Sequence, residues 1–207
     1  TSRGLGDVYK RQPDRLGQGG WRQDEEPSSK GLESMVNGIL KCNKIMVIGC
    51  PGGGKSTFAR ALGEITKLPV YHLDMLFWNA DKTNVDRETF LLRLGSVLEK
   101  DRWIIDGNYS FSMEMRLKEC DAVFFLDYPA KVCLDGVRTR MGKPRPDMPW
   151  IEQEYDGEFI QFIKSFKTER CPQIYALLEK YRDKPKVVFK TRAEAEEFLE
   201  AVRDKTK

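Results

Sequence analysis

The chain has 207 residues, of which 40% are hydrophobic and 32% charged, and its formal net charge is +3. This length and apolar content suit one α/β domain with its own core. The nearly balanced charge argues against a membrane surface and against bulk attraction to DNA or RNA, so nucleic-acid binding stays only as an alternative. The five scattered cysteines contain no C-x-x-C pair. We therefore expect a cytoplasmic monomer whose cysteines are reduced.

Residues 1–43 differ from the rest of the chain, because they are rich in Gly, Arg, Gln, Asp and Ser and have few periodic apolar positions. A segment of this composition does not bury enough apolar surface to order itself. Its first twelve residues also resemble a translated sequencing adapter. We expect 1–43 to be disordered or a non-native leader, and the folded domain to cover 44–207.

From residue 44 onward, strand patterns alternate with helix patterns. Short apolar runs predict strands at 44–48, 69–73, 103–105, 122–126 and 186–189. Amphipathic spacing predicts helices at 55–67, 86–100, 113–118, 131–141, 152–167, 173–181 and 191–203. This alternation indicates right-handed βαβ units and a parallel sheet covered by helices on both faces.

The strongest motif follows the first predicted strand and reads Gly49-Cys50-Pro51-Gly52-Gly53-Gly54-Lys55-Ser56-Thr57. It matches the Walker A pattern G-x-x-x-x-G-K-[ST] and precedes an amphipathic helix. Glycines allow backbone N–H groups to surround phosphate oxygens, and the helix N-terminus attracts the same anion. Lys55 is expected to bind the β- and γ-phosphates and Ser56 to bind Mg²⁺. The loop therefore predicts ATP and Mg²⁺ as ligands, and the alternative is a chance glycine-rich turn.

Three further strands each end at an aspartate, which places acidic groups at the edge of the sheet where ligands bind. Asp106 is expected to be a metal-side carboxylate; the alternative is a turn residue. Asp74 is expected to accept a substrate hydroxyl or act as a base, with a helix cap as the alternative. Asp127 and the lone histidine His72 are expected to have structural roles.

A basic segment follows the fourth predicted strand and contains Arg138, Arg140, Lys143 and Arg145. Mobile arginines stabilise the charge of a transferring phosphoryl group when a lid closes. We therefore expect a helical lid at about 131–150, in which Arg138, Arg140 and Arg145 are catalytic. The alternatives are a solvated basic face or a small nucleic-acid patch.

The aromatic residues near this segment are expected to pack in the core. They are Trp78, Trp103, Trp150, Tyr155, Phe159, Phe162 and Phe166. The acidic residues Glu152, Glu154 and Asp156 are expected on the solvated surface.

Four motifs in combination resemble the bacterial adenylate-kinase-related P-loop proteins often called DNA topology modulation proteins. The motifs are the phosphate loop, His72-Leu73-Asp74-Met75-Leu76-Phe77-Trp78, Trp103-Ile104-Ile105-Asp106-Gly107-Asn108-Tyr109 and Phe125-Leu126-Asp127-Tyr128-Pro129. The similarity runs from about residue 44 to the C-terminus. It implies a three-layer P-loop NTPase fold with a five-stranded parallel sheet of nucleoside-monophosphate-kinase type and a helical arginine lid.

The pair Asp106-Gly107 resembles the strand-three Asp-Gly of adenylate kinases. Those enzymes continue with an aromatic residue, a proline and an arginine, whereas Asn108-Tyr109 follows here. We expect Asn108-Tyr109 and Asp74 to bind the phosphate acceptor, with Arg116 as the replacement for the missing arginine. The acceptor is left open between a nucleotide and a small hydroxyl-bearing metabolite.

These observations together predict an ATP-dependent phosphotransferase, that is, an adenylate-kinase-like P-loop kinase. Its expected catalytic residues are Lys55, Asp74, Arg138, Arg140 and Arg145. Two alternatives are left open. One is a nucleotide-switched regulator that affects DNA topology, and the other is a simple ATPase with water as acceptor.

Overall fold

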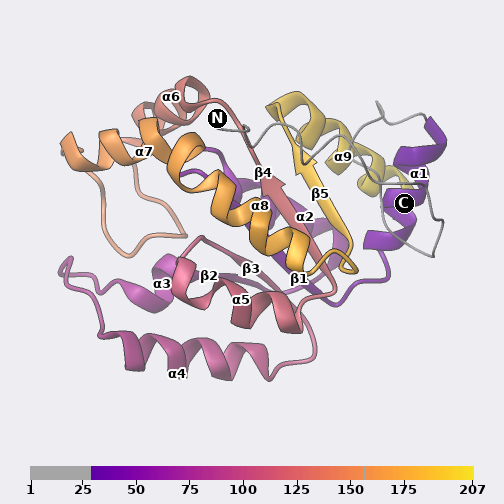
Figure 1. Cartoon of the computed structure of the whole chain (residues 1–207), viewed down its shortest axis with the longest axis horizontal. Helices are drawn as coiled ribbons and strands as arrows, with labels where there is room; N and C mark the ends of the chain where they lie inside the picture. Colours follow the sequence, from indigo (N-terminus) through magenta and orange to yellow (C-terminus); the bar gives the residue numbers. More distant parts are fainter. Residues whose placement is uncertain (1–28, 156) are drawn as a thin grey trace, which may run out of the picture.

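Five short apolar runs form the strands of one parallel sheet in the computed structural model, which describes residues 29–155 and 157–207. The strands are β1 (Lys44–Gly49), β2 (Val70–His72), β3 (Trp103–Asp106), β4 (Ala122–Leu126) and β5 (Lys186–Phe189). Their order is β2-β3-β1-β4-β5, so β1 is central (Figure 1). This arrangement confirms the predicted five-stranded parallel sheet of nucleoside-monophosphate-kinase order.

Helices precede, connect and follow these strands (Figure 1). Their bounds are α1 (Ser29–Ile39), α2 (Lys55–Thr66), α3 (Leu73–Phe77), α4 (Arg87–Leu98), α5 (Ser110–Glu119), α6 (Ala130–Arg140), α7 (Gly157–Glu169), α8 (Cys171–Lys180) and α9 (Arg192–Lys205). No helix among the described residues is long and apolar enough to cross a membrane.

Helices cover both faces of the sheet, and two neighbouring residues of β4 show this directly. The ring centroid of Phe124 lies 5.0 Å from that of Phe58 on α2 and 5.2 Å from that of Phe198 on α9. The ring of Phe125 instead lies 5.3 Å from that of Tyr175 on α8. Successive side chains of a strand point to opposite faces. The sheet is therefore the middle of three layers, as the continuous apolar strands predicted.

Helix α1 lies within the segment that we expected to be outside the folded domain. Val36 and Ile39 are each 1% exposed, and α1 packs against α9 (Figure 1). The apolar positions follow helical spacing at Leu32, Met35, Val36 and Ile39. Composition averaged over a long segment concealed this short pattern. Residues 1–28 lie outside the described part of the chain.

Two other elements differ from the predictions. The short helix α3 follows β2 directly, where only a strand end was expected. Helix α7 begins at Gly157, so the predicted helical turn from residue 152 is wrong. Residues 152–155 have no regular secondary structure, and the Glu152 carboxylate bonds there to Arg140 at the end of α6 and to the Tyr155 hydroxyl.

The docking of α1 gives a first prediction. Ile39→Ala should lower the free energy of unfolding by about 2–4 kcal/mol, because it leaves a cavity between α1 and the core. Urea denaturation followed by circular dichroism measures this change. Asn37→Ala, at an exposed position of the same helix, should change the free energy by less than about 0.5 kcal/mol. Equal, small effects of the two substitutions would show that α1 does not contribute to the core.

Candidate active site

The phosphate loop turns from β1 into α2 through glycines with left-handed backbone. Gly52 has φ +80° and Gly54 has φ +90°. A Cβ atom on Gly52 would lie 2.0 Å from the carbonyl oxygen of Cys133, and one on Gly136 would lie 2.1 Å from that of Gly52. The loop therefore packs against the backbone of α6 at a distance that only glycine permits.

Helix α2 begins at the end of this loop, so its first backbone N–H groups point toward the same space. Lys55 Nζ donates to the carbonyl oxygen of Cys50 at 3.3 Å. Arg192, the first residue of α9, donates from Nη2 to the carbonyl oxygen of Gly52 at 3.0 Å. The sequence analysis missed Arg192, because its partner is 140 residues away in the chain. Two cations and a helix N-terminus thus surround one anion site.

Asp106 connects the phosphate loop to strand β2. Ser56 Oγ donates to Asp106 Oδ2 at 2.5 Å, and His72 Nδ1 lies 2.5 Å from Asp106 Oδ1. The contact with His72 follows from the register of the sheet, which pairs His72 with Asp106. Asp106 is 3% exposed, so both of its oxygens are held in place. His72 therefore orients this carboxylate, a role that the sequence analysis did not assign to it.

Ser56 and Asp106 are suited to Mg²⁺, which prefers oxygen ligands. Within residues 29–155 and 157–207, no group of three or more His, Cys, Asp or Glu side chains could hold a metal ion. A magnesium ion bound with a nucleotide needs only one or two protein carboxylates, because waters and phosphate oxygens complete its shell. The hydroxyl and carboxylate pair therefore fits the expected metal position.

Asp74 lies on α3 and borders the same cavity. Its Oδ1 accepts a hydrogen bond from the Tyr109 hydroxyl at 2.7 Å. Burial raises the pKa of Asp74, and this effect exceeds the lowering by Tyr109 and by Lys55. The ring of Tyr109 stacks on Phe90 with centroids 5.0 Å apart, which holds the hydroxyl in place. Asp74 is thus a positioned carboxylate with an elevated proton affinity.

Asn108 borders the cavity, but its amide group is bonded to the phosphate loop. The Gly49 N–H donates to Asn108 Oδ1 at 3.1 Å, and Asn108 Nδ2 donates to the Gly49 carbonyl oxygen at 2.6 Å. This two-way contact fastens the first residue of the loop to the end of β3. Asn108 acts here on the loop, whereas the sequence analysis assigned it to the acceptor.

Arg116 is fully buried and does not border the cavity, so the expectation that it binds the acceptor finds no geometric support. Its Nη1 donates to the carbonyl oxygen of Gly107 at 2.8 Å, its Nε donates to that of Ser112 at 3.3 Å, and Nη2 contacts that of Asn108. Of these, the carbonyl oxygens of Gly107 and Asn108 lie in the tight turn between β3 and α5, before the helix begins. Arg116 satisfies them and stabilises the turn instead of reaching the cavity.

The lid arginines separate into two groups. Arg140 and Arg145 border the cavity, whereas the Arg138 side chain is 73% exposed and pairs with Asp135 at 3.3 Å. Residues two apart on a helix point about 200° away from each other. Because Arg140 faces the cavity, Arg138 points away from it. The predicted catalytic role of Arg138 therefore finds no geometric support.

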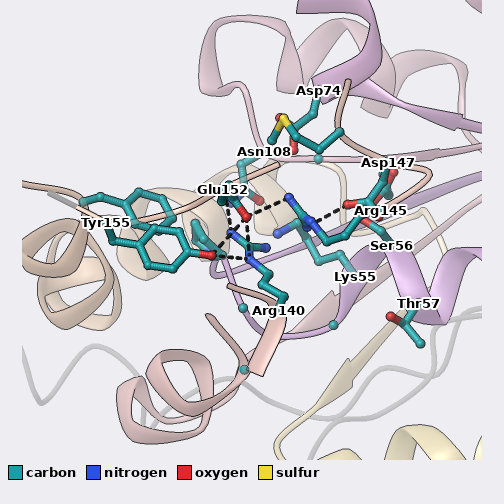
Figure 2. Close-up of a pocket in the computed structure, with 18 of the residues that line it drawn as sticks. Lys55, Ser56, Thr57, Asp74, Asn108, Arg140, Arg145, Asp147, Glu152 and Tyr155 are labelled. Carbon is teal, nitrogen blue, oxygen red and sulfur yellow. Dashed lines mark hydrogen bonds and ion pairs between the residues drawn. The ribbon is translucent and has the colours of Figure 1, made fainter. Parts of the chain in front are cut away.

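Two buried carboxylates hold these arginines, and the sequence analysis placed neither in the site. Glu152 is 7% exposed, and its Oε2 lies 3.1 Å from Arg140 Nε and 3.0 Å from Arg145 Nη2 (Figure 2). Asp147 is 3% exposed and lies 2.9 Å from Arg145 Nη1 and 3.0 Å from Arg60 Nη1. The expectation that Glu152 is solvated surface is wrong.

Of the other two acidic residues expected on the surface, Glu154 borders the cavity and Asp156 lies outside the described residues. Burial raises the pKa of Asp147, but Arg145 and Arg60 outweigh this effect and lower it. The presence of both charge signs in the segment Lys143 to Glu154 was a usable signal for such pairing. It could not show which charges face inward.

The cavity has a volume of about 580 Å³ and brings most of the predicted site residues together. Those that border it are Pro51, Gly52, Gly54, Lys55, Ser56, Thr57, Asp74, Asp106, Asn108, Tyr109, Arg140 and Arg145. The predicted residues outside its wall are Gly49, Cys50, Gly53, Arg116 and Arg138. Several aromatic residues expected in the core also border it, namely Trp78, Trp150, Tyr155, Phe159 and Phe162.

No protein-family model matches the sequence, and no curated protein matches it. Solved structures match the fold. Shikimate kinase from Acinetobacter baumannii, solved in complex with shikimate, matches with a TM-score of 0.54 and 17% identity over 82% of this chain and 98% of that one. Shikimate kinase from Bacteroides thetaiotaomicron matches with a TM-score of 0.50 and 20% identity over 79% of this chain and 97% of that one.

The chain has the fold of the P-loop kinases. In this fold, the segments that follow β1, β2 and β3 supply one part of the cavity wall, and α6 with the segment after it supplies another. This is the edge at which open parallel sheets bind ligands.

The structural role of Arg116 gives a second prediction. Arg116→Lys should lower the free energy of unfolding by about 2–4 kcal/mol, because buried carbonyl oxygens lose their donors. Chemical denaturation measures this change, with the exposed Arg203→Lys as the control. The affinity of the folded variant for ATP·Mg²⁺, measured by calorimetry, should change by less than about threefold. A stable variant that has lost ligand affinity would contradict this assignment.

Proposed function

We propose that this protein is an ATP-dependent kinase that transfers the γ-phosphoryl group of ATP·Mg²⁺ to a hydroxyl group of a small metabolite. One observation carries the proposal. A single cavity of about 580 Å³ is bordered by the phosphate loop, the Ser56 and Asp106 pair, Asp74 and two lid arginines. These are the groups that phosphoryl transfer requires for positioning and for charge stabilisation.

The donor side of the cavity is suited to a triphosphate. Gly52 and Gly54 present backbone without side chains, and Lys55 adds a positive charge. Arg145 Nη2 is buried and forms an ion pair with Glu152 Oε2 at 3.0 Å, but it donates no aligned hydrogen bond to a described residue. A phosphoryl oxygen would accept such a bond, and the bond would be charge-assisted.

Ser56 and Asp106 would hold the magnesium ion, with His72 keeping the carboxylate in position. The bound metal neutralises charge on the β- and γ-phosphates. The 2.5 Å contact between Ser56 Oγ and Asp106 Oδ2 brings the two oxygens to one region, which supports this assignment.

Asp74 is the proposed base for the acceptor. Tyr109 donates a hydrogen bond to one oxygen of the Asp74 carboxylate. The other carboxylate oxygen can accept the proton of the acceptor hydroxyl while the hydroxyl oxygen bonds to phosphorus. The raised pKa of Asp74 suits this task, because a base with a higher proton affinity takes the proton more readily.

The acceptor side supports a small metabolite over a nucleoside monophosphate. Arg116, the expected binder of an acceptor phosphate, is committed to backbone carbonyl oxygens, and the amide of Asn108 is committed to Gly49. Two structures with this fold are named shikimate kinases, one of them solved with shikimate, so the fold accommodates a small hydroxylated acceptor.

The test is γ-phosphoryl transfer from ATP·Mg²⁺ to a panel of hydroxylated metabolites, nucleosides and nucleoside monophosphates, with Lys55→Ala as the blank. We expect transfer to a metabolite, reduced in the variant by at least about 100-fold. Transfer to nucleoside monophosphates alone would overturn the acceptor class. Phosphate release without any acceptor would indicate an ATPase, and ATP binding without turnover would overturn the kinase proposal.

Asp74 gives a prediction that couples activity to stability. Asp74→Asn should reduce turnover by about 10²–10⁴-fold, because the base is lost. The pKa of this carboxyl is raised from 3.8, so the protein loses stability as the pH rises above about 3.8, and the loss is complete once the pH exceeds the folded-state pKa. Asp74→Asn should therefore be more stable than the wild type near pH 7, and the difference should vanish below about pH 4.

Thermal unfolding at both pH values measures the stability difference, with Asp101→Asn at an exposed position as the control. The wild-type turnover should also fall as the pH decreases through the pKa of Asp74. A variant that is destabilised at neutral pH would show that Asp74 has a structural role instead.

A further inference from the structure

The Glu152 carboxylate contacts two arginines, one at the end of a helix and one in the loop that follows it. Arg140 is the last residue of α6, and Arg145 lies in the loop that follows. Arg140 Nε and Nη2 lie 3.1 Å and 3.2 Å from the Glu152 carboxylate oxygens, and Arg145 Nη2 lies 3.0 Å from Oε2 (Figure 2). One carboxylate thus lies between two guanidinium groups.

This junction of Glu152, Arg140 and Arg145 is largely removed from water, which strengthens the electrostatic interactions among the three side chains. The side chains of Glu152, Arg140 and Arg145 are 8%, 21% and 15% exposed. Two guanidinium groups this close would repel each other in a medium of low dielectric constant if no anion lay between them. The charge of Glu152 therefore permits both arginines to border the same cavity.

The junction is also attached to its surroundings on both sides. The Tyr155 hydroxyl lies 3.0 Å from Glu152 Oε2, accepts from Arg140 Nε at 3.2 Å and lies 3.3 Å from the carbonyl oxygen of Val137 on α6. On the other side, Arg145 Nη1 bonds to Asp147. The bonded chain therefore begins at α6.

This chain of contacts ends at the helix that carries the phosphate loop. Asp147 Oδ1 accepts from Arg60 Nη1 of α2 at 3.0 Å. Arg140 and Arg145 are consequently held between α6 and α2. Arg145 Nη2 lies close to Glu152, but its N–H groups do not point at the carboxylate in hydrogen-bond geometry. An N–H of Nη2 can therefore still donate to an incoming oxygen.

We propose that Glu152 is a positioning residue for phosphoryl transfer, which holds Arg140 and Arg145 against the transferring group. This inference rests on the proposed function. Arginines fixed before the reaction stabilise the developing charge without reorganisation, so their positioning acts on the transition state more than on bound ATP. Loss of Glu152 should therefore lower kcat and leave ATP affinity nearly unchanged.

The opposite role would be that of a counter-anion. In that case Glu152 would occupy the place of a phosphate group and compete with ATP for the arginines. Its neutralisation would then tighten ATP binding and leave turnover unchanged or higher. The two roles predict changes in different quantities, which makes them separable.

The experiment compares the wild type with Glu152→Gln, Glu152→Asp and the exposed control Glu158→Gln. Steady-state kinetics gives kcat and KM for ATP, and calorimetry gives Kd for ATP·Mg²⁺. We expect Glu152→Gln to lower kcat by about 10- to 100-fold and to change Kd by less than threefold. Glu152→Asp, which retains the charge, should recover part of kcat, and Glu158→Gln should match the wild type.

A substitution cycle tests whether Glu152 acts through its arginines. If it acts through both arginines, adding Glu152→Gln to a variant that already carries Arg140→Ala and Arg145→Ala should cause no further loss of kcat. Additive losses would overturn the proposal, as would tighter ATP binding with unchanged kcat. A parallel fall in kcat and melting temperature without recovery in Glu152→Asp would also overturn it, because it would indicate a structural role alone.

A further readout does not depend on the acceptor. Fluoroaluminate bound with ADP·Mg²⁺ resembles a phosphoryl group in transfer, and its affinity should fall in Glu152→Gln by about the same factor as kcat. If no acceptor is phosphorylated but this affinity falls, the kinase proposal fails and the positioning role stands. An affinity for this complex that Glu152→Gln leaves unchanged would overturn the positioning role even in an active kinase.

Discussion

The parallel pairing of β1 with β3 is the constraint on which the rest of the site depends. It sets Val47 opposite Asp106, so the phosphate loop leaves β1 directly beside the carboxylate at the end of β3. Asn108 then fastens Gly49 to the same strand end, and Arg116 satisfies the turn that follows. These bonds fix the start of the loop relative to the carboxylate at the end of β3.

The cavity selects its ligand by directed donors, since its wall carries balanced charge. The cationic side chains on the wall are Lys55, Arg60, Arg140, Arg145 and Arg192, and the anionic ones are Asp74, Asp106, Asp147, Glu152 and Glu154. A neutral wall attracts anions weakly at long range. In the proposed function, recognition of phosphate would then come from the loop N–H groups and from arginines whose N–H groups are held in place by carboxylates. The buried carboxylates in the lid are the cause of that orientation.

Local patterns predicted much of the molecule correctly. Strands β4 and β5 were predicted to the residue, because strands covered on both faces are continuous apolar runs. The position of the glycine-rich loop after β1 and of Asp106 at the end of β3 followed from the motif and from the geometry of parallel sheets, whereas Asp74 lies on α3. The roles of Glu152, Asp147 and Arg116 were not predictable in this way, because a charged residue in a loop or helix has the same local pattern whether it faces water or the interior.

The sequence by itself determined the element order, the sheet and the phosphate-binding edge, since each depends on periodicity or on residues adjacent in the chain. Only the tertiary structure decided which charges meet. Arg192 reaches Gly52 across 140 residues, and Glu152 pairs with Arg140 through a loop without periodic pattern. Such pairing is determined by burial, because a charge excluded from water must find a partner, and the partners that packing makes available lie far apart in the chain.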